Sequence, residues 1–138
     1  MMRYMLDTNV CVELIRGRAP AVFDRLRRFD VDEVAVSSIT LAELQYGAAK
    51  SSDPGRHREL LAKFLAPLAV LSFDALAGES YGDLRAALEK VGKPIGPLDT
   101  LIAAHALSLG ATLVTNNQRE FRRVRGLHVE NWTGAEAT

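Results

Sequence analysis

Three carboxylate side chains lie in segments of the chain that are otherwise apolar. Asp7 occurs in MLDTN, Glu43 in TLAEL and Asp99 in PLDTLIAAHA. At about 100° per residue, the segment around Asp99 has apolar side chains on nearly all sides, which is typical of a buried helix. Because a buried, unpaired carboxylate costs free energy, Asp99 is expected to have a partner.

Each of these acids also has a local structural explanation. Asp7 can cap a helix that begins near Thr8, and Thr40 with Glu43 has the spacing of a capping box. Asp99 can be a carboxylate favoured by the positive end of a helix dipole. Each explanation stays open for a single acid, but the occurrence of all three in apolar sequence favours a shared role.

Short apolar runs and longer amphipathic runs alternate along the chain. The short runs predict strands at residues 3–7, 34–37, 69–73, 112–117 and 127–132. The longer runs predict helices at residues 8–17, 19–29, 37–50, 57–66 and 74–91, and one that begins at Asp99 and reaches Leu109. Residues 50–56, KSSDPGR, form the clearest loop. This alternation predicts an α/β fold with a central, mostly parallel sheet flanked by helices.

The acids follow the predicted strands in a regular way. Asp7 ends the first strand, Glu43 lies early in the helix after the second, and Asn117 and Glu120 follow the fourth. Because sites of such folds lie at the carboxyl ends of the strands, these side chains are expected to converge there. Asp99 can join them only if the chain crosses the sheet, so that its helix starts near the same edge.

Carboxylates that meet at one edge repel one another. Two of them ~4 Å apart repel by about 4 kcal/mol at an effective dielectric constant near 20. Three together would offset much of a domain's typical stability of ~5 to 15 kcal/mol. The only basic residue within these motifs is Arg119, and the three histidines lack paired ligand spacing. All-oxygen ligation favours Mg²⁺ or Mn²⁺ over zinc, and such an ion suits phosphodiester hydrolysis.

Composition limits the class of protein. A chain of 138 residues that is 48% hydrophobic suits one globular domain, residues 1–138. Seventeen basic residues balance seventeen acidic ones, so no overall positive field attracts nucleic acid. Cys11 is the single cysteine, and no secretory signal or long apolar stretch is evident. We therefore expect a cytoplasmic protein with no disulfide and no membrane contact.

Four segments in order resemble a known family. They are MLDTNV, SSITLAELQYGA, GPLDTLIAAHA and LVTNNQREFRRV. Their order and spacing are similar to those of PIN-domain ribonucleases, specifically the VapC toxins of bacterial toxin–antitoxin pairs, and the resemblance extends to the closing GLHVENW. It implies a single PIN domain with a PIN-like three-layer fold, and a Mg²⁺-dependent endoribonuclease that inhibits translation. A likeness to enzymes that cut initiator tRNA in its anticodon stem-loop implies the same substrate here.

The resemblance also implies roles by position. Asp7 and Asp99 match the acids that hold Mg²⁺, with Mn²⁺ as an alternative, and Glu43 matches the acid that ligates the metal or orients water. Many relatives have an aspartate two residues after the threonine that matches Thr115, where this chain has Asn117. Glu120 is then the candidate for that acidic role, and whether one or two metals bind stays open. The expected catalytic residues are Asp7, Glu43, Asp99 and Glu120, with support from Asn9, Thr115 and Asn117.

The resemblance further implies a homodimer and a VapB-type antitoxin. The C-terminal segment of the antitoxin would occupy the active-site groove and bring a basic side chain near the acids. Contacts to RNA are expected from the late arginines Arg119, Arg122 and Arg123, which lie nearest the acids in sequence. The earlier arginines, within residues 16–28, are explained equally well as solvated charge.

Two other function classes remain as alternatives. A phosphoacceptor receiver domain also clusters acids around Mg²⁺, but it needs an acidic pair at the first strand and a lysine after the last. This chain has one acid in LDTN and no lysine in LHVENW. A non-catalytic binding module, in which the acids serve only as caps, predicts no specific affinity for Mg²⁺ or Mn²⁺.

Overall fold

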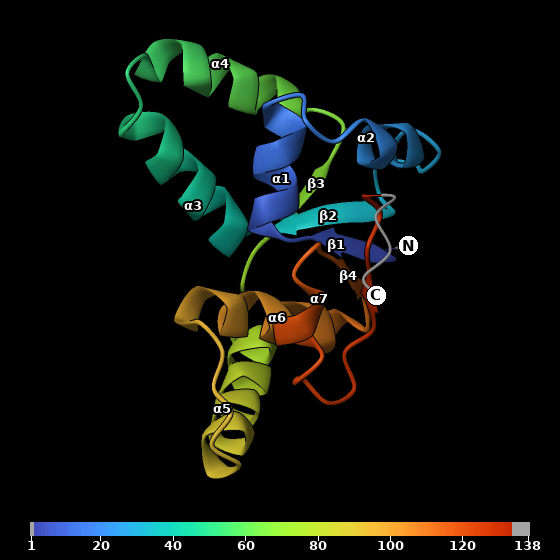
Figure 1. The fold of residues 1–138 in the computed structure, drawn as a ribbon, viewed down its shortest axis with the longest axis vertical. Coiled ribbons are helices and arrows are strands. Elements are labelled where there is room, and N and C mark those ends of the chain that lie inside the picture. Colours follow the sequence, from blue (N-terminus) through green and yellow to red (C-terminus); the bar gives the residue numbers. More distant parts are fainter. Residues whose placement is uncertain (1, 134–138) are drawn as a thin grey trace.

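The structure, a computed structural model, describes residues 2–133, and Figure 1 shows the course of the chain. The strands within these residues are β1 (Tyr4–Leu6), β2 (Val34–Ser37), β3 (Ala69–Leu71), β4 (Thr112–Val114) and β5 (Val129–Glu130). The helices are α1 (Thr8–Ile15), α2 (Pro20–Leu26), α3 (Ser38–Ala49), α4 (Pro54–Leu65), α5 (Ala75–Lys90), α6 (Pro97–Leu109) and α7 (Gln118–Phe121).

The strands form one parallel sheet in the order β3-β2-β1-β4-β5. The predicted parallel α/β fold is therefore confirmed. From β1 the chain continues to β2 and β3 on one side, whereas β4 and β5 lie on the other side of β1. The strand order therefore reverses between β1 and β4. In folds of this kind the crevice between two such strands, at their carboxyl ends, is the usual position of a site.

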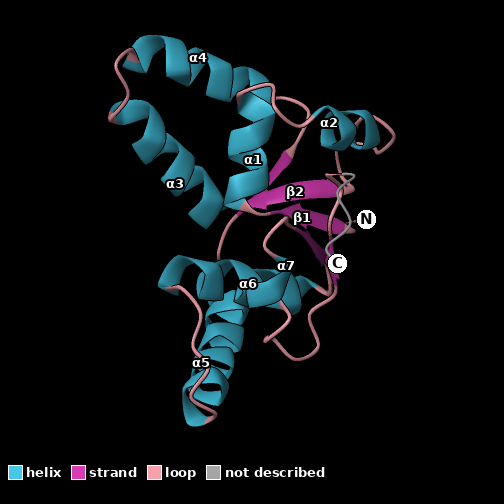
Figure 2. Cartoon of the chain, viewed as in Figure 1, coloured by secondary structure: helices cyan, strands magenta, loops and turns pink. Residues whose placement is uncertain are grey.

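Helices cover both faces of the sheet (Figure 2). Successive residues of β1 show why, since Tyr4 and Leu6 face one core and Met5 faces the other. The first core includes side chains of α1, α2, α3 and α4, whereas the second includes side chains of α5, α6 and α7. The three-layer architecture thus follows from the two-residue period of short strands that are apolar on both faces.

The helix that contains Asp99 is less buried than its sequence predicts. Its middle is buried from Ile102 to Ala106, where it lies between α5 and the sheet. Leu98 and Leu109, however, are 45% and 40% exposed. The prediction of a helix apolar and buried on all sides is therefore wrong at both ends, because the neighbouring elements cover only the middle of α6.

Two segments near predicted loops are helical. Within the stretch predicted as a loop, Pro54 begins α4, and the Asp53 side chain caps the helix by accepting from the Arg56 amide at 3.2 Å. The polar turn after β4 continues into the short helix α7, which Phe121 anchors in the core. No helix among the described residues is long and apolar enough to cross a membrane.

A cluster of aromatic rings packs at the amino-terminal end of β1. The Trp132 ring lies 4.9 Å from the Tyr4 ring and 5.5 Å from the Phe29 ring, between centroids. The Arg25 guanidinium lies 4.8 Å from the Trp132 ring centroid. This cluster ties the segment after β5 to the first strand, and Trp132 is only 3% exposed.

We predict that Trp132→Ala lowers the free energy of unfolding by about 3–5 kcal/mol, because it opens a cavity among packed rings. Phe23→Ala is the matched control, since it also removes an aromatic ring, but one that is 53% exposed. The control should lose less than about 1 kcal/mol. Urea unfolding with an unchanged m-value measures both, and equal losses would show that the cluster contributes little.

Candidate active site

Asp7 lies at the carboxyl end of β1, beside the point where the strand order reverses. One carboxylate oxygen, Oδ1, accepts from the Val10 amide at 2.8 Å and so caps α1. The other, Oδ2, accepts a hydrogen bond from the Thr115 hydroxyl, which follows β4. The capping explanation is therefore confirmed for Asp7, but it accounts for only one of the two oxygens.

Burial governs the electrostatics of Asp7, which is only 2% exposed. Desolvation raises the pKa of its carboxyl above the ordinary value, and the charge of Glu43 raises it further. The hydrogen bonds from Thr115 and Val10 oppose this by stabilising the charged form. The chain thus holds a costly buried carboxylate in one fixed orientation.

Glu43 lies on α3, close enough to Asp7 for its charge to act on that carboxyl. Its Oε1 accepts from the Thr8 hydroxyl at 2.7 Å, and the Thr8 Oγ1 also lies 3.1 Å from the Thr40 Oγ1. The capping-box explanation for Thr40 and Glu43 is wrong, because the cap of α3 is Ser37, three residues before Thr40. Both residues lie inside the helix, so Glu43 is free of the backbone and is oriented by Thr8.

Asp99 lies in the first turn of α6, which Gly96 precedes. No described residue gives its side chain a hydrogen bond, so Asp99 is not a hydrogen-bonded cap, whereas its place in the first turn agrees with the helix-dipole explanation. Burial raises the pKa of Asp99 to about 6, and the charges of Glu120, Asp7 and Glu43 add to the rise. α6 therefore starts at the same sheet edge as the other acids, so the chain crosses the sheet before Asp99 as predicted.

Glu120 stands next to Asp99 and is held at both oxygens. Its Oε1 accepts from the Gly96 amide at 3.1 Å, and its Oε2 accepts from the Asn117 side-chain amide at 2.8 Å. The Asn117 backbone amide in turn donates to the Thr115 hydroxyl at 2.9 Å. At the position where relatives are expected to have an aspartate, this chain thus has Asn117, whose side-chain amide orients Glu120.

No arginine or lysine neutralises these carboxylates within the described residues. The ion pairs there join Arg3 to Glu33, Arg25 to Glu130 and Arg85 to Glu89, all elsewhere. Four carboxylates from separate parts of the sequence therefore share one region without a cation. They are Asp7, Glu43, Asp99 and Glu120.

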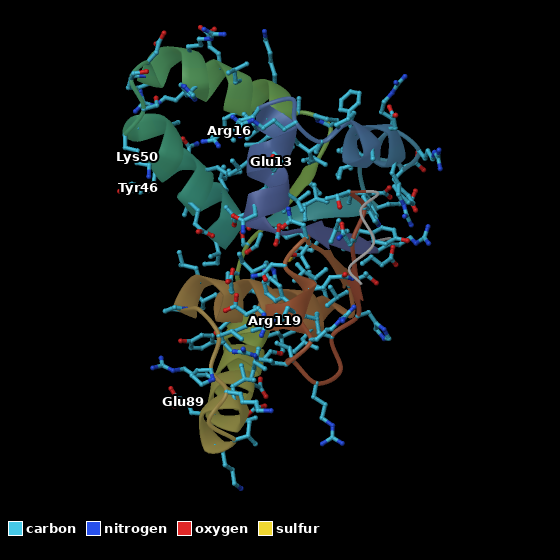
Figure 3. All side chains as sticks on the ribbon, viewed as in Figure 1. Glu13, Arg16, Tyr46, Lys50, Glu89 and Arg119 are labelled. Carbon is cyan, nitrogen blue, oxygen red and sulfur yellow. The ribbon has the colours of Figure 1, made fainter. Side chains whose placement is uncertain are left out.

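The arginines expected to bind RNA differ in their surroundings. Arg119 and Arg122 are exposed on and after α7, and Figure 3 shows Arg119 beside α6. Arg123 donates to the Pro94 carbonyl at 3.1 Å, which ties α7 to the loop before α6. Of the earlier arginines, Arg16 is the C-cap of α1, at the opposite end of that helix from Asp7, and Arg25 pairs with Glu130.

The residues present fit a hard divalent cation. The site offers oxygen atoms only, their charges are uncompensated, and the Asp99 carboxylate is without a hydrogen-bond donor among the described residues. No three His, Cys, Asp or Glu side chains of the described chain complete a ligand set by themselves. Mg²⁺ commonly binds through one or two carboxylates and keeps several waters, which the pair Asp7 and Asp99 can satisfy.

Sequence reasoning did not identify two contributors to the site. Thr8 orients Glu43, and Gly96 both donates to Glu120 and leaves room for Asp99, whose Oδ2 would lie 3.4 Å from an added Cβ. The position of Thr8, directly after a strand-ending acid, was the available signal. Asn9 is exposed with no hydrogen bond among the described residues, so its supporting role stays a prediction.

Comparisons with known proteins agree with this arrangement. Residues 4–127 match the PIN domain family. The chain is 43% identical over 133 residues to the tRNA(fMet)-specific endonuclease VapC of Shigella flexneri, covering 96% of this chain and 100% of that protein. It is 44% identical over 132 residues to ribonuclease VapC2 of Haemophilus influenzae, covering 96% and 99%.

Solved structures give the same result for the fold. VapBC from Salmonella typhimurium, crystallised bound to DNA, superposes with a TM-score of 0.91 at 42% identity, covering 96% of this chain and 99% of that one. The matches in sequence and in fold both span nearly the whole chain. This protein therefore belongs to the PIN-domain family and, within it, to the VapC proteins.

Proposed function

We propose that this protein is a divalent-metal-dependent endoribonuclease and the toxin of a toxin–antitoxin pair. The observation that carries the proposal is the group of four carboxylates near the carboxyl ends of β1 and β4, to which no arginine or lysine of residues 2–133 is paired. Relatives that are 43% and 44% identical to this chain are named an endonuclease and a ribonuclease, which supports the same activity here.

Asp7 and Asp99 are the proposed ligands of Mg²⁺, or of Mn²⁺ in its place. When bound, such an ion supplies charge stabilisation at a phosphoryl group and a more acidic water. The chain contributes orientation: Thr115 and Val10 fix Asp7, and Thr8 fixes Glu43. Glu120, held by Gly96 and Asn117, adds negative charge beside Asp99, so it is the proposed fourth acid.

The substrate that we propose is initiator tRNA, cut in its anticodon stem-loop, which would inhibit translation and places the activity in the cytoplasm. The support is the name of the Shigella flexneri relative. Arg119 and Arg122 are the proposed contacts to RNA phosphates, because they are exposed and close in sequence to Glu120. Arg123 is tied to Pro94, so its expected role is to hold the loop before α6 rather than to bind RNA.

The proposed partner is a VapB-type antitoxin. Solved relatives at 42–43% identity are VapBC complexes bound to DNA. A basic side chain from the C-terminal segment of the antitoxin would satisfy the uncompensated acids, because charge-assisted hydrogen bonds to carboxylates are strong. We also propose that the protein forms a homodimer. No observation favours the receiver-domain alternative.

The first test replaces each acid by its amide. Asp7→Asn, Glu43→Gln and Asp99→Asn should each reduce cleavage of tRNA at least about 100-fold, because each removes a charge at the site while keeping side-chain size. Purified protein is incubated with total tRNA and Mg²⁺ or Mn²⁺, and the new RNA ends are sequenced. Glu59→Gln, an exposed acid on α4, is the matched control and should cleave normally.

Intact tRNA with every metal and no inhibitor bound would contradict the nuclease proposal. The same result combined with no specific Mn²⁺ affinity would favour a binding module in which the acids are structural. Cleavage of RNA at another site with an unchanged dependence on the acids would keep the activity and remove the initiator tRNA substrate.

A second prediction concerns Thr8. Thr8→Val keeps the shape of the side chain but removes the donor to Glu43, so cleavage should fall about 10- to 100-fold with the fold intact. Thr8→Ser keeps the hydroxyl and should recover most of the activity. Single-turnover cleavage rates with circular dichroism as a folding check measure this, and normal cleavage by Thr8→Val would mean that Glu43 needs no orientation.

A third prediction follows from the pKa of Asp99. Because this pKa is about 6 in the folded protein against an ordinary 3.8, the folded state holds the proton more tightly than the unfolded state. The resulting stabilisation is complete below the ordinary value and is lost as the pH rises through about 6. The carboxylate is only partly buried, so we expect only about 1 kcal/mol after solvent screening.

The measurement compares wild type with Asp99→Asn in a metal chelator. The free energy of unfolding of Asp99→Asn, minus that of wild type, should rise by about 1 kcal/mol between pH 4.5 and pH 7.5. Adding Mn²⁺ at pH 7.5 should then raise the stability of the wild type more than that of the variant. An advantage that does not change with pH would show that Asp99 is not destabilised by its neighbours.

A further inference from the structure

A buried histidine joins the two helices that present Glu43 and Asp99. The His105 Nδ1 of α6 lies 2.8 Å from the Ser37 Oγ, at the end of β2 and the start of α3. Ser37 is 0% exposed and His105 is 1% exposed, so water does not compete for this contact. Ser37 and His105 are distinct from the residues proposed for metal binding and catalysis.

The direction of this hydrogen bond follows from the other bond of Ser37. The Ile39 amide donates to the Ser37 Oγ at 3.1 Å, which caps α3. The Ser37 hydroxyl has no other acceptor among the described residues, so a His105 ring with an unprotonated Nδ1 satisfies the buried hydroxyl proton. Burial lowers the pKa of His105, with an opposing effect of Asp74, and this favours the neutral ring that an acceptor requires.

An aromatic ring packs edge-on against the His105 ring. The Phe73 ring lies 5.5 Å from the His105 ring at an interplanar angle of 78°, and the Phe73 amide donates to the Ser38 Oγ at 3.0 Å. The start of α3 is thus bound both to α6 and to the segment that follows β3. No other side-chain hydrogen bond joins α6 to this region within the described residues.

This contact has consequences for the site because of where it lies. Asp99 is six residues before His105 on α6, and Glu43 is six residues after Ser37 on α3. At about 1.5 Å per residue, each carboxylate is about 9 Å along its helix from the contact. A small shift of one helix against the other therefore moves Asp99, a proposed ligand, relative to Glu43, which ligates the metal or orients its water, and ligand distances tolerate only about 0.2 Å.

We propose that His105 is a positioning residue for the site, which through Ser37 fixes the spacing between Asp99 on α6 and Glu43 on α3. Apolar packing alone holds two helices together but leaves their sliding less restricted, whereas one directional hydrogen bond at the joint sets their register. The inference rests on the proposed function, since the property that it protects is the geometry of a metal-binding site.

The test measures Mn²⁺ affinity of the whole protein, by titration calorimetry, for variants at both ends of the contact. His105→Leu keeps an apolar core but has no acceptor, and Ser37→Ala has no donor. Each should weaken Mn²⁺ binding about 10- to 100-fold. The double variant should bind no more weakly than Ser37→Ala alone, because Ser37→Ala removes the bond that His105→Leu removes, together with the cap of α3.

Two further variants separate positioning from general stability. His105→Asn places an acceptor oxygen where the Nδ1 lies, and it should bind Mn²⁺ within about threefold of wild type. Val22→Ala removes a buried side chain of α2 from the core on the opposite face of the sheet from α6. It should leave Mn²⁺ affinity unchanged even where it lowers the free energy of unfolding as much as His105→Leu does. If His105→Leu does not fold, Ser37→Ala and His105→Asn decide the question.

Wild-type Mn²⁺ affinity in Ser37→Ala and in every folded His105 variant would overturn the positioning role and leave the proposed function standing. Weakening by Val22→Ala in proportion to its loss of stability would also overturn it. Absence of Mn²⁺ binding in the wild type itself would instead remove the proposed function, and this inference with it.

Discussion

The hydrogen bond from Thr115 to Asp7 is the contact on which the arrangement of the site depends. It crosses from the end of β4 to the end of β1, where the strand order reverses and a parallel sheet leaves a crevice. The bond fixes one oxygen of a carboxylate that is almost fully buried, and the α1 amide of Val10 fixes the other. Two other acids are placed relative to this immobile charge: Glu43 through Thr8, and Glu120 through the amide of Asn117, itself bonded to Thr115. Asp99 is placed by the start of α6 alone.

Holding these acids together is unfavourable for the chain alone. The raised pKa values of Asp7 and Asp99 express that cost, which burial causes and neighbouring negative charge increases. A folded protein accepts such a cost at functional sites, where a ligand of opposite charge offsets it. A metal ion and a basic side chain of an antitoxin are alternative ways to neutralise the same group of charges, so the proposed activity and the proposed inhibition have one physical origin.

The sequence predicted more of the fold than of the site's internal contacts. The five strands and the six long helices follow from apolar periodicity, which is a local property, and the order of the acids along the chain gave their convergence at one edge. The short helix α7 was not predicted, because its single buried anchor, Phe121, gives no periodic pattern. The capping box at Thr40 was wrong because Ser37, at the end of β2, is an equally good cap and begins the helix earlier. The uniform burial expected for α6 was wrong at Leu98 and Leu109, because periodicity does not say how far a neighbouring element extends.

The sequence by itself determined the class of fold, the positions of the acids and the hard, oxygen-only character of the group they form, because strand period, residue type and chain order are all properties of local sequence. Only the tertiary structure decided which oxygen of Asp7 caps a helix and which meets Thr115, that Thr8 rather than the backbone holds Glu43, and that His105 meets Ser37 across 68 residues. These choices depend on packing between segments that are distant in sequence. A hydroxyl or an imidazole can bond many partners, and the packing of the core selects one of them.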